Sequence, residues 1–382
     1  MHLIEDPSES FGKDQLSYWL ALAQCASGLQ LWKFYEKFHS LRPLWQANYD
    51  ELVTIGATEN MGLPWLSPRF VDKFIKKRQT LEPEKLYKAL EESGATAYPM
   101  EHPAYPAMLR HIEDPPAILY HLGGLPLSEL EPSLGIVGTR NPSLYGQKHA
   151  KAFARDLAAA GVTIVSGMAI GVDSYAHWGA IEAGGRTVAV VAGGPDHCYP
   201  SSNKPLYKKL TEDRLCCVIS EFFPGINPDK WHFPLRNRII AGMTKGLLVI
   251  EAGEKSGSLI TASQAFDYGR SVFAIPNKID SPQSVGTHRL ITETKAKLIV
   301  KPEDILTDLN IAGHRRRKEA PRAIELFGRE HEVFELLGDE PVHFDRLIEI
   351  TGMGVGELSS TLTMLELAGV VERLAGDAYI KA

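Results

Sequence analysis

The chain has 382 residues, a formal net charge of -6, and 44% hydrophobic and 23% charged residues. This length allows two or three domains with a large core, and the composition is that of an ordinary globular protein. The acidic balance excludes a globally basic nucleic-acid binder, so any polyanion site has to be a local patch. The amino terminus lacks a basic-then-apolar signal pattern, and no apolar run reaches membrane-spanning length; we therefore expect a cytoplasmic protein.

The cysteines predict neither a metal centre nor a disulfide framework. Cys25, Cys198, Cys216 and Cys217 form no paired CxxC motif. Cys216 and Cys217 lie in an apolar run, where buried free thiols are expected. We expect no metal and no cofactor.

Residues 1–92 are predicted to form a small helical accessory domain of the SAM-like kind. Apolar residues recur at helical spacing between Asp14 and Leu90, and prolines and glycines punctuate the segment. Its aromatic residues are expected in the core rather than on a base-stacking surface.

Residues 93–308 are predicted to form an extended Rossmann-like domain of α/β class, with a doubly wound sheet. The first strand expected is Ala117–Leu122, at a sheet edge, because Pro115 and Pro116 cannot donate ladder hydrogen bonds. Strands and helices then alternate, which is typical of a parallel sheet covered on both faces. The expected strands are Leu134–Val137, Val162–Val165, Thr187–Val191, Cys217–Ile219, Leu247–Ile250 and Val272–Ile275, with Leu298–Val300 as a candidate last strand. The expected helices are Gln147–Ala160, Tyr175–Ala183 and Ser258–Tyr268.

Residues 309–323 are predicted to be a basic linker, and residues 324–382 a winged-helix domain. Three expected helices, Leu326–Leu337, Phe344–Thr351 and Val355–Ala368, precede a hairpin around Gly376. From Glu325 onward, twelve acidic residues stand against four Lys and Arg residues, a net charge of about -8. Because this charge would repel DNA phosphates, the pattern favours a protein-interaction role over a DNA reader.

Candidate functional residues follow several of the predicted strands, at the sheet edge where open α/β sheets bind ligands. After the strand at 134–137, Gly138 permits close approach of a ligand and Arg140 supplies a cation. The loop at Ser166, Gly167 and Gly171 precedes a helix and offers backbone amides to an anion. Its spacing is not that of a dinucleotide fingerprint.

A second glycine-containing segment, residues 256–261, also begins a helix. Ser258 in this segment is interpreted as the helix N-cap.

The segment Lys230–Gly242 is the most informative, because cations hold phosphates and rings stack on bases irrespective of sequence. It carries Lys230, Trp231, His232, Phe233, Arg236, Asn237 and Arg238. Trp231 and Phe233 are either core or stacking residues. Arg236 and Arg238 need carboxylate or phosphate partners; Glu221 and Glu251 could pair with them, and we expect at least one arginine to bind phosphate.

The chain has no P-loop, no GxSxG, no HExxH and no evident nucleophile with its base. Lone histidines such as His177 are more often structural. Phosphate-binding parts without a catalytic set predict a binding protein rather than an enzyme.

These residues resemble the bacterial DNA-processing protein A family, also called DprA or Smf. The resemblance covers residues 98–300 and is highly specific in combination. Its motifs are Val137-Gly138-Thr139-Arg140, Ser166-Gly167-Met168-Ala169-Ile170-Gly171-Val172-Asp173, Tyr199-Pro200 with Asn203, Ser220-Glu221, Trp231-His232-Phe233-Pro234 with Arg236-Asn237-Arg238, Glu251-Ala252, and Ser256-Gly257-Ser258-Leu259.

The resemblance implies a sequence-independent binder of single-stranded DNA without enzymatic activity. It also implies protection of incoming DNA in natural transformation (competence), loading of the RecA recombinase, and a homodimer formed through the Rossmann domain. Carried over by position, the DNA contacts are Arg140, Lys230, Phe233, Arg236 and Lys204.

The chain departs from the family pattern at His288, where asparagine is usual, at Lys295-Ala296, and at Asn277, where glycine is usual. The resemblance therefore carries over no DNA contact to this last loop.

An enzyme is the competing interpretation. The fold also resembles nucleoside-monophosphate phosphoribohydrolases, in which Glu251 would be the candidate acid or base. Their PGGxGTxxE motif is absent from residues 251–258, which argues against this alternative. A third interpretation is an adaptor that acts through the acidic winged helix.

Overall fold

The structure is a computed structural model that describes residues 12–58, 61–311, 326, 328–338, 340–374 and 376–381. The chain divides into two compact units, Met1–His314 and Arg315–Ala382, and each has a hydrophobic core of its own. In the described ranges, no helix is both long and apolar enough to cross a membrane.

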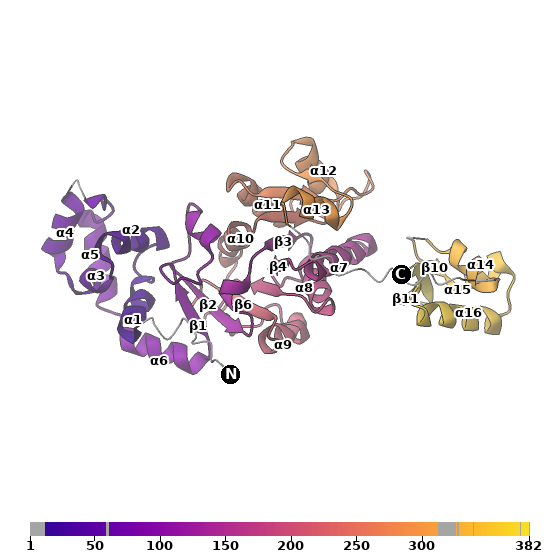
Figure 1. Ribbon diagram of the computed structural model, residues 1–382, viewed down its shortest axis with the longest axis horizontal. Coiled ribbons are helices and arrows are strands. Elements are labelled where there is room, and N and C mark those ends of the chain that lie inside the picture. The colour runs from indigo at the N-terminus through magenta and orange to yellow at the C-terminus, as the bar shows by residue number, and fades with distance from the viewer. Residues whose placement is uncertain are drawn as a thin grey trace. The chain divides into compact units, whose positions relative to one another are not determined.

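The front of the first unit is helical, as predicted (Figure 1). Capping boxes start two of its helices, at Ser27 with Gln30 and at Asn48 with Glu51. Trp19 is fully buried in a core that continues into the sheet, so the expectation of core aromatics is confirmed for it. The helices are α1 Lys13–Leu22, α2 Gly28–Phe38, α3 Arg42–Gln46, α4 Tyr49–Ala57, α5 Pro68–Arg78 and α6 Pro83–Ser93.

Among the described residues, nine strands form one sheet in the order β1-β2-β6-β5-β4-β3-β7-β8-β9. Strands β3 to β9 are parallel, which confirms the doubly wound α/β fold. The strands are β1 Thr96–Pro99, β2 Ile118–Gly123, β3 Ser133–Val137, β4 Thr163–Ser166, β5 Thr187–Val190, β6 Cys216–Ser220, β7 Gly246–Val249, β8 Ser271–Ala274 and β9 Lys297–Leu298.

The prediction that the strand near residues 117–122 lies at an edge is wrong. Strand β2 pairs with β6 on one side and with β1 on the other, so β1 is the edge strand. Pro115 and Pro116 precede β2 and therefore remove no hydrogen bond from its ladder. The proline within the sheet is Pro99, at the end of the edge strand, where a missing donor is tolerated.

Two helices begin three residues earlier than predicted because of their local caps. Helix α7 is Leu144–Ala159, and Ser143 Oγ accepts a hydrogen bond from Gly146 N at 3.2 Å. Helix α8 is Val172–Glu182 and starts directly after Gly171, whose φ of 85° only glycine adopts readily.

The sheet is covered on both faces (Figure 1). Helices α7, α8 and α13 pack on one face, against Leu134, Ile136 and Leu248. Helices α10, α11 and α12 pack on the other face, against Leu247 and Val249.

Cys216 and Cys217 are buried free thiols, as expected. The remaining helices are α9 Lys204–Glu212, α10 His232–Gly242, α11 Ser258–Asp267, α12 Val285–Thr292 and α13 Pro302–Asp308, with short 3₁₀ turns η3 Ala107–His111, η4 Leu127–Glu129 and η5 Ser201–Asn203.

The second unit has the predicted order of three helices and a hairpin, which confirms the winged helix. Its described residues give a sheet of three strands in the order β10-β12-β11. Leu347, Leu358, Leu362 and Tyr379 belong to its core. Of the predicted linker, residues 312–323 lie outside the described residues. The elements are α14 Arg329–Leu336, β10 Val342–His343, α15 Phe344–Thr351, α16 Val355–Leu367, β11 Val371–Leu374 and β12 Ala378–Lys381.

Candidate nucleic-acid interface

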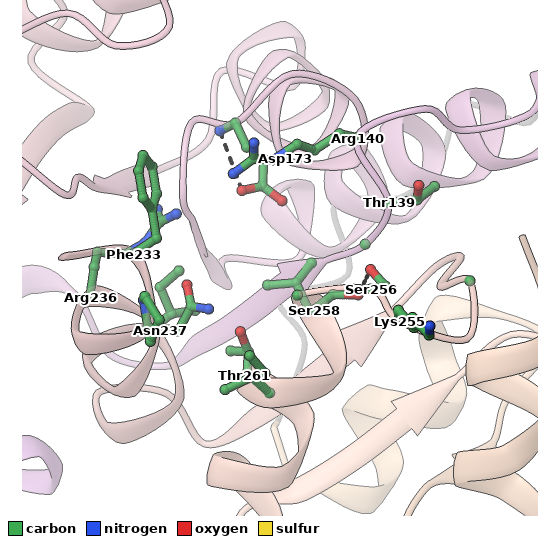
Figure 2. Close-up of a pocket in the computed structure, with 18 residues that line it drawn as sticks. Thr139, Arg140, Asp173, Phe233, Arg236, Asn237, Lys255, Ser256, Ser258 and Thr261 are labelled. Carbon is green, nitrogen blue, oxygen red and sulfur yellow. Dashed lines mark hydrogen bonds between the residues drawn. The ribbon is translucent and has the colours of Figure 1, made fainter. Parts of the chain in front are cut away.

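The order in which successive strands are added to the sheet changes direction at β3. Strands β4, β5 and β6 extend the sheet to one side of β3, and β7 then pairs on the other side. The loops after β3 and β7 therefore part toward opposite faces, as at the ligand-binding crevice of open α/β sheets. A cavity of about 460 Å³ lies there, between residues 137–140, residues 253–258 and helices α10 and α11 (Figure 2). We call it the switch-point cavity.

Gly138 lets the loops at this cavity meet closely. A Cβ atom at Gly138 would lie 2.6 Å from Val172 Cγ2 and 2.9 Å from the Glu251 carbonyl oxygen. The next residue, Thr139, donates its backbone N–H to that same carbonyl at 2.7 Å. Gly171 meets the other side of the turn, since a Cβ there would lie 2.5 Å from the Thr139 oxygen. Of the two glycines, Gly138 lines the cavity and Gly171 serves the packing of the loop.

Arg140 and Phe233 form the rim of the switch-point cavity. Arg140 is exposed, and its Cζ lies 5.6 Å from the centroid of the half-buried Phe233 ring. The Phe233 ring lies 5.7 Å from the ring of Tyr199, which is 49% exposed. Both rim residues also line an adjoining cavity of about 100 Å³. The rim thus combines a solvent-accessible cation with aromatic surface.

Arg236 lies in the wall of both cavities and is held by the fold. Its guanidinium is buried and donates a hydrogen bond to the Val190 carbonyl oxygen. It also packs on Gly167, where any side chain would overlap it. Burial lowers the pKa of Arg236 to about 10, against the opposing effect of the neighbouring Asp173 carboxylate.

Asp173 occupies the amides that the sequence analysis assigned to a ligand. Its Oδ2 accepts hydrogen bonds from Gly167 N at 3.1 Å and from Ala169 N at 3.4 Å. The anion that the Gly167 amide faces is therefore a carboxylate of the protein itself. Burial raises the pKa of Asp173, whereas the charge of Arg236 and these amides lower it.

Arg238 lies outside the switch-point cavity. Its Nη2 is 2.8 Å from Glu221 Oε2, and its Nε is 3.5 Å from Asp114 Oδ2. The side chain is 8% exposed, and these carboxylates are partners of the kind that the sequence analysis expected. A turn of 3.6 residues directs Arg236 and Arg238 to different sides of α10.

The other predicted site residues are spread over the surface and the interior. Ser166 is fully buried and its Oγ donates to the Ile136 carbonyl oxygen at 2.6 Å, which ties β4 to β3. Lys204, at the start of α9, and Lys230, just before α10, are exposed and line neither cavity. Asn237 lines the switch-point cavity.

The α11 side of the cavity comes from residues 256–261, which the sequence placed at this sheet edge without assigning them a ligand contact. Lys255, Ser256, Ser258 and Thr261 line this side (Figure 2). The N-cap of α11 is Gly257 rather than Ser258, and no side chain caps the helix. Instead, the hydroxyls of Ser256 and Ser258 pair at 2.8 Å. The Ser-Gly-Ser sequence at a helix start was the available signal for a polar wall.

Glu251 serves the scaffold. It is fully buried; its Oε1 accepts from Ser143 Oγ at 2.6 Å and from Asn277 Nδ2 at 2.8 Å. Its Oε2 accepts from Ser143 N at 2.9 Å, and it lines neither cavity. Asn277, a departure from the family pattern, thus has a local role.

Within the described residues no three His, Cys, Asp or Glu side chains cluster closely enough to hold a metal ion.

The fold and cavity define a Rossmann-like protein with a cationic switch-point site, followed in the chain by a winged helix. Residues 96–310 match the family model of DNA recombination-mediator protein A, and residues 317–377 match that of the DprA winged helix domain. The chain belongs to the DNA recombination-mediator protein A family. This membership confirms the resemblance inferred from the motifs.

The relatives agree with this assignment. The chain is 30% identical over 402 residues to Protein Smf of Synechocystis, covering 95% of this chain and 98% of the relative. It is 42% identical over 221 residues to DNA processing protein DprA of Bacillus subtilis, covering 58% and 73%.

Two solved structures share the fold. DNA processing protein A of Streptococcus pneumoniae superposes with a TM-score of 0.64 and 32% identity, over 76% of this chain and 96% of that one. The Helicobacter pylori protein, whose structure was described for its single-stranded DNA binding mode, gives 0.51 and 28%, over 58% and 99%.

Proposed function

We propose that this chain binds single-stranded DNA without sequence preference and serves DNA processing in transformation and recombination. Membership of the DNA recombination-mediator family supports this function, as does the likeness to the Helicobacter pylori protein described for its single-stranded DNA binding. The groove would run along the carboxyl edge of the sheet, past the switch-point cavity.

The Arg140–Phe233 pair is the observation that carries the proposal. An exposed guanidinium 5.6 Å from an aromatic centroid supports a phosphate contact and a stacked base within one nucleotide of each other. Every base has a π-face, so stacking on Phe233 is tolerant of sequence. Phosphate contacts from Arg140 position the strand and carry no sequence information.

Lys230 and Lys204 extend this charge along the proposed groove. Both are exposed, and Lys230 stands three residues before Phe233 in the chain. Such local cations release counterions from the strand, which is how a protein of net charge -6 would still bind a polyanion. Binding of this kind weakens steeply as salt concentration rises.

A binding role rather than catalysis is proposed for the cavity. Glu251, the candidate acid or base of the phosphoribohydrolase alternative, is bound by Ser143 and Asn277 outside the cavity. Asp173, the carboxylate among the described lining residues, is engaged by two loop amides. These contacts disfavour the enzyme alternative.

The proposed partners beyond DNA are a second copy of the chain and the RecA recombinase, both acting in the cytoplasm. The family resemblance supports a homodimer through the sheet-containing unit and RecA loading. The acidic winged helix is proposed to contact protein rather than DNA, because its net charge of about -8 opposes phosphate binding.

Fluorescence anisotropy of a labelled oligo-dT, at low and at moderate salt, tests the proposed function. The wild-type protein should bind in a salt-sensitive manner, and Arg140→Glu should bind at least tenfold more weakly. Arg69→Glu, which changes an exposed arginine on α5, is the matched control and should bind like wild type. Failure of the wild type to bind at either salt would refute the proposal, and base release from AMP would then be assayed.

A further inference from the structure

We propose that Trp231 is a second base-stacking residue at the carboxyl edge of the sheet, and that it takes a different nucleotide from the one at Arg140 and Phe233. This inference rests on the proposed single-stranded DNA binding and deepens it, because it gives the bound strand a path along the sheet edge. The exposure of the ring, the contacts that hold it and the charge beside it support it separately.

Trp231 is the most exposed tryptophan of the chain. It is 60% exposed, whereas Trp19 is fully buried and the other four tryptophans are at least partly buried. Folding buries most of the surface of an average tryptophan, so an indole in solvent is available to a ligand. Trp231 lines neither of the two cavities at this edge and therefore offers a surface separate from them.

Two neighbouring rings hold the indole without stacking on it in parallel. Its centroid lies 4.1 Å from that of His232, at an interplanar angle of 71°, and 6.3 Å from that of Phe222, at 85°. Both contacts are T-shaped, which is a favourable arrangement for aromatic pairs. Neither neighbour takes the parallel position, so that position is open to a base.

The two supporting rings are themselves fixed. Phe222 and His232 stack with their centroids 3.9 Å apart and their planes at 29°. His232 is 5% exposed, and its Nδ1 lies 2.9 Å from the Ala192 carbonyl oxygen. Phe222 donates its backbone N–H to Ser220 Oγ at 3.0 Å, at the end of β6. The indole thus rests on an ordered support, and ordering it for a ligand costs little.

The residue beside the ring favours a nucleic-acid partner over a protein. Lys230 directly precedes Trp231 and is exposed. One exposed cation beside one ring is the combination that the Arg140–Phe233 pair also has, and it is typical of grooves for single strands. The core of a protein interface is instead depleted of charged residues around its aromatic anchors.

Trp231 and Phe233 face different parts of the sheet edge. They are two residues apart at the start of α10, about 200° around a helix. Phe233 lies by Arg140, which follows β3, whereas Trp231 lies by Phe222, which follows β6. Two strands separate β3 from β6, so the ends of β3 and β6 are about 14 Å apart. A stacked strand advances about 3.4 Å per base, so the two rings serve different nucleotides.

Tryptophan fluorescence tests the inference, with a dT 15-mer as the probe. A base stacked on the indole quenches its emission, so wild-type emission should fall as the 15-mer binds. Trp231→Phe keeps a ring and should bind within about twofold of wild type, while most of the fall in emission is lost. An unchanged fall in emission in Trp231→Phe would overturn the inference.

Affinity separates the second ring from the first. Trp231→Ala should bind the 15-mer about tenfold more weakly with an unchanged salt slope, because one stacked base is lost and no charge is removed. Trp231→Ala with Phe233→Ala should lose the product of the two single losses. A double variant no weaker than Phe233→Ala would overturn the inference. Tyr49→Ala is the matched control, because this 41% exposed aromatic residue lies on α4, and it should bind like wild type.

Light scattering identifies a protein contact at the same ring. A Trp231→Ala variant that changes the oligomeric state but keeps wild-type affinity for the 15-mer would make Trp231 a protein-interface residue and overturn the inference. Wild-type binding that no Trp231 variant alters would overturn the inference and leave the proposed function intact. A wild-type protein that does not bind the 15-mer would refute the proposed function, and this inference with it.

Discussion

The guanidinium of Arg140 lies over the ring of Phe233, although the two residues come from different elements. Arg140 follows β3 and Phe233 lies in the first turn of α10, yet Cζ is 5.6 Å from the ring centroid. A cation in this position is attracted by the negative face of the ring, which orients the arginine without neutralising it. Charge and stacking can therefore be tested separately at one place.

Removing the ring should weaken binding without changing its salt dependence. Phe233→Ala should cost about 1–3 kcal/mol in oligo-dT affinity, because one stacked base loses its platform. Phe233→Trp keeps a ring and should retain most of the affinity. Anisotropy titrations at several salt concentrations measure both quantities; an alanine variant with wild-type affinity would show that the ring is a packing residue.

Removing the cation should change the salt dependence itself. Arg140→Ala should reduce the slope of log K against log salt by about 0.7, the contribution of one phosphate contact to a single strand. Arg140→Lys keeps the charge and should keep the slope. A wild-type slope in the alanine variant would exclude a direct phosphate contact.

Much of the fold was predictable because each strand is a short apolar run followed by a turn. The six expected strands from Leu134 to Ile275 are present with ends within one residue of their predicted positions. The edge of the sheet was not predictable in the same way, because strand β1 ends in a proline and pairs antiparallel with β2. Pairing partners depend on tertiary contacts that local periodicity does not contain.

The candidate site was predictable where a motif of the sequence marks the residue, and unpredictable where a side chain is paired by groups that no motif connects to it. Arg140 and Phe233 come together as expected from their motifs. The sequence alone did not show that Arg236 lines the cavity whereas Arg238 does not. The partners of Arg238, Glu221 and Asp114, approach it only in the folded chain. The positions of the two arginines on α10, two residues apart and hence about 200° around the helix, were the signal available.

Gly167 should tolerate no side chain. Gly167→Ala places a methyl group on the Arg236 guanidinium and should lower the free energy of unfolding by about 1–3 kcal/mol, as overpacking does. Gly257→Ala is the matched control, because no atom lies within 4 Å of its Cβ position and its φ is -61°. Denaturant unfolding compares the two; equal stabilities would contradict the close packing at Gly167.

Arg236 should matter for stability more than Arg140 does. Arg236→Met leaves Asp173 buried without its neighbouring cation and should cost about 3–5 kcal/mol of unfolding free energy. Arg236→Met with Asp173→Asn should recover part of that loss, because the second change removes the uncompensated charge. A fully stable Arg236→Met with weakened DNA binding would instead make Arg236 a DNA ligand.

His177 should make the protein less stable as the pH falls below about 6.5. The ring is fully buried, with Nδ1 2.7 Å from Thr187 Oγ1, and burial lowers its pKa to about 3, assisted by the charge of Arg236. Between pH 6.5 and 3, His177 is therefore protonated in the unfolded chain and neutral in the folded chain. In this range the free energy of unfolding decreases as the pH decreases, by up to about 1.4 kcal/mol per pH unit.

Replacing His177 should remove that contribution. His177→Asn should show a shallower dependence of unfolding free energy on pH between 7.5 and 5.5 than wild type, measured by urea unfolding at each pH. The raised pKa of Asp173 acts in the opposite direction, but it is present in both proteins and cancels in the comparison. Parallel curves for the two proteins would mean that His177 accepts its proton in the folded state, contrary to its full burial.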